Sequence, residues 1–108
     1  MQARISRFTG LTPERLSAAI DWFRDEQLEQ LESQEGFEGM LVAVNRISGR
    51  ATAITLWESE RAMRRSEKAA DQVRAGAVST AGGVDEQIVD RYEVVVERLP
   101  AREAPLAG

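Results

Sequence analysis

Apolar positions follow a two-residue repeat in four short segments of the chain, which is the spacing of β-strands. The segments are Gln2–Phe8, Met40–Val44, Arg50–Trp57 and Ile88–Glu97. The second and third are joined by a short stretch around Ser48-Gly49, which predicts a hairpin. In Met40–Val44 both faces of the strand are apolar, with Phe37, Leu41 and Ala43 expected on one face and Met40, Val42 and Val44 on the other.

Two longer segments have the spacing of amphipathic helices. Thr12-Pro13-Glu14 is a strong start for a helix over residues 13–33, because threonine can cap free amides and proline suits the first turn. Its apolar stripe is interrupted by Gln27, and Gly36 is expected to end the segment; the stripe comprises Leu16, Ala19, Ile20, Phe23 and Leu31. Ser59 can cap a second helix over residues 60–78, whose inward residues are mostly small.

The predicted order is β-α-β-β-α-β, the split β-α-β arrangement of ferredoxin-like α+β domains with an antiparallel sheet. Two helices cover only one face of such a sheet. Since the strand Met40–Val44 is apolar on both faces, the second face also needs a cover. A second copy of the same sheet is the simplest cover, so we expect a homodimer that pairs through its sheet faces into a dimeric α/β barrel.

The length of 108 residues fits one domain, expected over residues 1–99. Residues 100–108 contain two prolines and few apolar side chains, and are expected to form a flexible C-terminal tail. No run of residues approaches the roughly 20 apolar residues of a membrane span. The net charge of −4 argues against nucleic acid as a partner, because phosphate binding needs a basic surface.

The chain contains no cysteine and no histidine. The absence of cysteine fits a reducing cytoplasm, where we expect the protein to be located. The absence of histidine removes the usual general base and the usual ligand of metals and of haem. We therefore expect neither a metal site nor a cofactor.

Two motifs resemble those of antibiotic biosynthesis monooxygenase-like domains, which belong to the dimeric α/β-barrel superfamily. They are Glu35-Gly36-Phe37-Glu38-Gly39-Met40, after the first helix, and Ile54-Thr55-Leu56-Trp57-Glu58-Ser59, before the second. The resemblance covers roughly residues 3–97. It implies the barrel fold, and it is compatible with several activities, among them oxygenases that act on quinols and polyketides without a cofactor. Haem degradation is not implied, because the histidine and the first-strand asparagine of that branch are missing here.

Four residues are candidates for binding a small aromatic ligand: Trp57, Tyr92, Asn45 and Phe37. The resemblance places Trp57 in the pocket between sheet and helices, although a tryptophan there can equally fill the core. Tyr92 can donate a hydrogen bond to a substrate oxygen or satisfy its hydroxyl locally. Asn45, near the hairpin, is also a common turn residue.

Arg4 and Arg7 can orient an anionic substrate, but we expect them on the surface or at the dimer rim. No residue is assigned as a general base. The function implied is a cofactor-independent monooxygenase for a small quinol- or polyketide-like aromatic. The alternative is a non-catalytic homodimer of the same fold that binds a small ligand or acts in a stress response, so whether the chain is an enzyme stays open.

Overall fold

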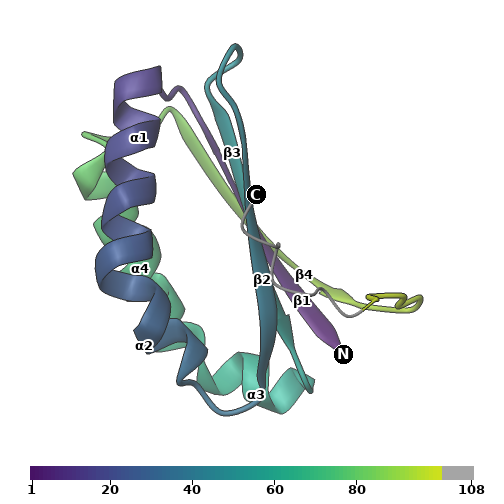
Figure 1. The fold of residues 1–108 in the computed structure, drawn as a ribbon. Helices are drawn as coiled ribbons and strands as arrows, with labels where there is room; N and C mark the ends of the chain where they lie inside the picture. The colour runs from purple at the N-terminus through teal and green to yellow at the C-terminus, as the bar shows by residue number, and fades with distance from the viewer. Residues whose placement is uncertain (101–108) are drawn as a thin grey trace, which may run out of the picture.

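The structure, a computed structural model, describes residues 1–100 and consists of one four-stranded antiparallel sheet with helices on one face (Figure 1). The strands are β1 (Gln2–Thr9), β2 (Phe37–Asn45), β3 (Arg50–Trp57) and β4 (Glu86–Glu93). They lie in the order β2-β3-β1-β4, which is the predicted ferredoxin-like arrangement. Most of the predicted tail, 101–108, lies outside the described residues.

The first helical segment starts where the sequence predicts but is not one regular helix. Helix α1 (Pro13–Trp22) begins with Pro13 in its first turn, and the Thr12 hydroxyl accepts from the Arg15 amide at 3.3 Å. A π-helical turn, η1 (Phe23–Gln27), separates α1 from α2 (Leu28–Glu32). In this turn the Leu28 amide donates to the Phe23 carbonyl five residues earlier. Leu28 thus faces the interior where regular spacing would have placed Gln27, the polar interruption of the predicted stripe.

The second helical segment is divided in a similar way. Helix α3 (Glu60–Arg65) is capped by Ser59, whose hydroxyl accepts from the Ala62 amide at 3.1 Å. After Ser66 the chain continues as α4 (Glu67–Thr80). Helices α1 and α4 lie side by side over the sheet (Figure 1). Gly76 permits this contact, because a Cβ atom there would lie 2.4 Å from the ring of Trp22.

Two details of the strands correct the sequence-based expectations. Strand β4 spans Glu86–Glu93, so it starts two residues earlier and ends four residues earlier than the predicted segment Ile88–Glu97. A bulge at Glu38 pairs Phe37 with Trp57 and Gly39 with Leu56. The extra residue moves Phe37 to the helix-covered face, away from Leu41, with which simple alternation had grouped it.

The core between helices and sheet is divided into two clusters. One contains Leu31, Trp57, Ala62 and Met63, with Phe23, Phe37 and Met40 packed against it. We call it the tryptophan cluster. The other is built on Leu11, Leu16 and Ala81 and lies toward the β2–β3 turn, with its partly buried neighbours mostly small or aliphatic. The two clusters occupy opposite ends of the same helix–sheet layer. The candidate site lies at the end of the second cluster, whose Leu11, Leu16 and Ala81 line it.

Candidate functional site

A cavity of about 300 Å³ lies between the sheet and the helices. Its sheet side is formed by β2 and β3, and its helix side by α1, η1 and α4. Almost every side chain lining it is apolar, and many are small; the sheet side includes Met40, Val42, Val44, Ala51 and Ala53, and the helix side Ile20, Phe23, Leu28, Ala77 and Val78. A cavity of this size and lining suits a small, flat apolar molecule.

The cavity opens along the edge strand β2. Val42 lines it, yet this side chain keeps 46% of its surface exposed. Strand β2 pairs only with β3, so its outer edge has no neighbouring strand within the described chain. The exposed side of Val42 therefore marks the outer margin of the cavity, on the β2 side.

A smaller cavity of about 50 Å³ lies deeper in the molecule, toward the tryptophan cluster. Both cavities share part of their lining, namely Phe23, Met40, Ala53, Val73 and Arg74. The smaller cavity is also lined by three polar side chains, Arg4, Ser6 and Thr55. In the larger cavity, Arg24 and Arg74 are the polar exceptions in an apolar lining. The inner end of the site is therefore polar and cationic, while the outer part is apolar.

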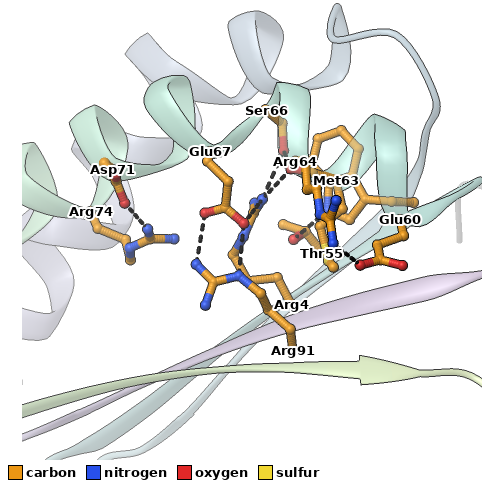
Figure 2. A network of polar contacts seen from close by, with 11 residues as sticks. Arg4, Thr55, Glu60, Met63, Arg64, Ser66, Glu67, Asp71, Arg74 and Arg91 are labelled. Atoms are coloured by element: carbon orange, nitrogen blue, oxygen red, sulfur yellow. Dashed lines mark hydrogen bonds and ion pairs between the residues drawn. The ribbon is translucent and has the colours of Figure 1, made fainter.

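Arg4 is the most deeply buried charged residue at this end, with 2% of its surface exposed. The expectation that it lies on the surface or at the dimer rim is wrong, because β1 is a central strand and Arg4 faces the helices. Its Nη2 donates to the Met63 carbonyl at 2.7 Å and to the Ser66 hydroxyl at 2.8 Å (Figure 2). The same nitrogen lies 3.1 Å from a carboxylate oxygen of Glu67. Arg7, by contrast, is exposed and pairs with Asp90.

Glu67 lies between two arginines, as Figure 2 shows. Besides its contact with Arg4, it accepts from Nε and Nη2 of Arg91 at 2.7 and 2.8 Å. These bonds from Arg91, together with the charge of Arg4, lower the pKa of Glu67 to about 2 despite its partial burial. Glu67 is therefore a carboxylate at neutral pH and is too weakly basic to take a proton from a phenol.

Two of the four candidate ligand residues come together, in the tryptophan cluster. Trp57 is completely buried, and its ring meets Phe37 edge to face at 5.6 Å between centroids. The Trp57 indole Nε1 donates to the Thr55 hydroxyl at 2.9 Å, and the Arg4 guanidinium lies 5.5 Å from the indole centroid. Neither Trp57 nor Phe37 lines the two cavities. This geometry agrees with the interpretation that Trp57 fills the core. Trp57 contributes to the site indirectly, because its ring contacts Arg4 and Thr55 and holds them in place.

The other two candidates lie away from these two cavities, although Tyr92 lines a separate, polar surface pocket of about 550 Å³ together with Glu67 and Arg91. The Asn45 side chain accepts from the amides of Ile47 and Ser48, each at 3.0 Å, which is the turn chemistry considered for it. It lies at the opposite end of β2 from Phe37, roughly 25 Å away along the strand. Tyr92 is on β4, pairs in register with Ala3 and is 43% exposed, with its hydroxyl 3.5 Å from Asp90.

Sequence reasoning considered Arg4 for orienting an anionic substrate but favoured a surface position for it, and it missed Arg74. Arg74 is 9% exposed, pairs with Asp71 and lines both cavities. The register could have indicated Arg4, because antiparallel pairing places it opposite Thr55, on the face of Trp57. Among residues 1–100, no three side chains of the acidic, cysteine and histidine types come together as a metal site would need. The described helices include none long and apolar enough to cross a membrane.

Comparison with known proteins gives a match in structure only. No protein-family profile matches the sequence, and no curated protein matches it either. Among solved structures, a monooxygenase of Streptomyces coelicolor (ActVA-Orf6), in complex with the ligand nanaomycin D, superposes with a TM-score of 0.74. The two sequences are 15% identical, and the match covers 93% of this chain and 92% of that one.

Two further structures are similar over nearly the whole chain. SnoaB of Streptomyces nogalater, a cofactor-independent oxygenase, has a TM-score of 0.65 at 18% identity, covering 93% of this chain and 97% of its own. A dimeric ferredoxin-like protein from an uncultured marine organism has a TM-score of 0.67 at 15% identity, covering 93% of both chains. The ferredoxin-like fold is thereby confirmed, and the resemblance to antibiotic biosynthesis monooxygenase-like domains extends to the fold of the whole described domain.

Proposed function

We propose that this protein is a monooxygenase that binds a small, flat phenol- or quinol-type molecule in the larger cavity and oxidises it with dioxygen, without a cofactor. The observation that carries the proposal is the apolar cavity itself, which is open at β2 and large enough for two or three fused rings. The fold it shares with ActVA-Orf6 and SnoaB supports the choice of reaction.

The reaction balances if the substrate supplies all the electrons. A phenol with hydrogen at the para carbon reacts with one dioxygen to give a quinone and one water. A carbon–oxygen bond forms at the para carbon, the carbon–hydrogen bond there breaks, and the second oxygen atom leaves as water with the two hydrogens. The protein contributes an apolar site in which substrate and oxygen meet.

The reaction can be tested with 1-naphthol and isotopically labelled dioxygen. We expect saturable binding by calorimetry and a naphthoquinone product that carries one labelled oxygen atom, with the second label in water. Ala77→Leu should fill the cavity from α4 and weaken binding by at least about tenfold, with a change in unfolding free energy under about 1 kcal/mol. Ala75→Leu, on the exposed face of the same helix, is the matched control. If 1-naphthol does not bind, or binds equally well to Ala77→Leu, the proposal fails.

A second candidate is a non-catalytic small-molecule binder of the same fold. One observation favours it: among the described residues, no Asp, Glu or Tyr side chain lines either cavity. A proton acceptor is therefore not built into the site. Saturable binding of 1-naphthol without formation of labelled product would support this candidate over the monooxygenase.

We also propose that the protein acts as a homodimer joined through the uncovered face of its sheet. On this face Leu41 is 62% exposed, Tyr92 43% and Ile88 42%. Exposed apolar residues on a sheet face are typical of an interface, and the similar marine protein is dimeric. Light scattering should give about twice the chain mass of 12.0 kDa. Leu41→Arg should give the single chain mass with an unchanged circular dichroism spectrum; a wild-type monomer would contradict the dimer.

A further inference from the structure

The guanidinium of Arg4 has more hydrogen-bonding capacity than its surroundings use. Its Nη2 makes all the contacts described above, whereas Nε and Nη1 are fully buried and have no partner within the described residues. A buried donor without a partner destabilises a protein by about 1–3 kcal/mol, more when the group is charged. Two such donors on one side chain, in a lining position of the smaller cavity, indicate a site that is completed by something that binds there.

The charge of Arg4 is also incompletely balanced. Glu67 is held by two hydrogen bonds from Arg91 and meets Arg4 through a single nitrogen. Three guanidinium groups (Arg4, Arg74 and Arg91) thus face two carboxylates (Glu67 and Asp71), which leaves this cluster with one positive charge (Figure 2). Burial is the largest cause that lowers the pKa of Arg4. Glu67 opposes it by its charge and its hydrogen bond, and the charges of Arg74 and Arg91 lower the pKa further by smaller amounts. An arginine nevertheless stays protonated at neutral pH.

The smaller cavity has room for one or two water molecules or for one small oxygen-bearing group. It lies at the inner end of the larger cavity, with which it shares five lining residues. An aromatic ring in the larger cavity can therefore carry a substituent that reaches Arg4. Among the described residues, the absence of a proton acceptor from the lining of both cavities also favours an anionic ligand, since a substrate that is already ionised needs no proton acceptor.

We propose that Arg4 forms an anion subsite at the inner end of the cavity, so that the aromatic ligand binds as an anion whose phenolate, enolate or carboxylate oxygen accepts from Nε or Nη1, the two Arg4 nitrogens without a partner in the described part of the chain. The anion subsite depends on the proposed function in one respect only, namely that the ligand has an aromatic part. The donors are fixed before the ligand arrives, by Met63, Ser66 and the ring of Trp57. The charge of this fixed guanidinium can thereby stabilise a negative oxygen during the oxidation.

The test compares two ligands of nearly the same shape and different charge. 2-Hydroxy-1,4-naphthoquinone is an anion at pH 7, and its methyl ether, 2-methoxy-1,4-naphthoquinone, is neutral. We expect the wild-type protein to bind the anion at least about tenfold more tightly, as charge-assisted hydrogen bonds allow. Arg4→Met should remove this preference while changing the affinity for the ether less than about threefold, and Arg4→Lys should retain part of it.

Arg91→Met is the matched control. It removes the same charge and the same kind of contact to Glu67, but Arg91 lines neither cavity. The variant should keep the preference for the anion. If Arg4→Met keeps it as well, or if the wild-type protein prefers the ether, the anion subsite is overturned while the aromatic cavity stands.

A measurement on the wild-type protein covers the case in which Arg4→Met does not fold. Sodium formate is titrated while the Nε–H resonance of Arg4 is followed by nitrogen-15 NMR, with Arg4→Lys used for assignment. We expect a saturable shift of this resonance. If neither naphthoquinone binds but formate shifts the signal, the proposed function fails and the subsite stands. If formate leaves the signal unchanged, the partner of Arg4 is water only and the subsite is overturned.

Discussion

The two ends of the helix–sheet layer differ in how they are filled. At one end Trp57 is fully buried among Leu31, Met63 and Phe37, and its side chain lines neither cavity. At the other end alanines and valines from α1, α4, β2 and β3 face one another across the cavity. The backbone layers are the same at both ends, so the size of the side chains decides where the molecule is solid and where it is hollow.

The two ends therefore have different roles, because the solid end supports Arg4 and the hollow end provides the surface that binds a ligand. The solid end fixes Arg4, because Trp57, Met63 and Ser66 all contact its side chain. The hollow end is lined almost entirely by apolar side chains, apart from Arg24 and Arg74. A rigid cationic end and an adaptable apolar end together suit a ligand that has one charged and one apolar part.

The largest effect is expected from emptying the solid end. Trp57→Ala should lower the free energy of unfolding by roughly 3–5 kcal/mol, since it removes a fully buried aromatic ring and leaves a cavity. Val78→Ala, which shortens a half-buried side chain at the hollow end, should cost about 1 kcal/mol. Urea denaturation measures both. Equal losses would show that the two ends are packed alike.

A smaller effect is expected from the charge of Glu67. Its folded-state pKa of about 2 lies below the ordinary value of 4.5, so its contribution to stability is present above pH 4.5 and is lost as the pH falls toward 2. Because the carboxylate is 25% exposed, we expect about 1–2 kcal/mol. Glu67→Gln should therefore be less stable than wild type at pH 7 and nearly equal at pH 2, by chemical denaturation at each pH.

The control for this measurement is Glu60→Gln, which disrupts the exposed pair with Arg64 on α3. Its effect should stay below about 0.5 kcal/mol at either pH. A gap between wild type and Glu67→Gln that persists unchanged at pH 2 would contradict the ion-pair explanation.

The smallest effect is expected at the tip of the hollow end. Asn45→Ala removes two side-chain bonds to the turn amides and should cost roughly 0.5–1 kcal/mol. The affinity for 1-naphthol should stay within about twofold of wild type, because Asn45 does not line the cavity. Calorimetry with both proteins measures this. A loss of affinity beyond tenfold would instead place Asn45 in the binding site.

The fold could be predicted well because its signals are local. The two-residue and helical repeats, the caps at Thr12 and Ser59 and the hairpin at Ser48-Gly49 all depend on neighbouring residues, and the structure confirms each of them. Errors occurred where one residue is added to a regular repeat. The bulge at Glu38 moves Phe37 to the other face, and η1 brings Leu28 inward in place of Gln27.

The site was harder to predict because it depends on contacts between distant parts of the chain. Arginine is usually a surface residue, so Arg4 gave no sign of burial until β1 was known to be central and paired with Thr55 on β3. Its partners Met63, Ser66 and Glu67 come from the junction of α3 and α4, about sixty residues away. The small side chains of the second helix did indicate space above the sheet. They did not indicate that Trp57 would lie outside the lining of this space.

The π-helical turn η1 also affects how this chain should be aligned with others. Relative to a regular helix, Phe23–Gln27 contains one extra residue, so alignment with a protein whose first helix is regular requires a one-residue gap there. Without the gap, Leu28 is matched to the position after the inward-facing one, which Gln27 occupies instead. Between chains that are only 15% identical, as with ActVA-Orf6, placing that gap determines which residues of α2 are compared as equivalent.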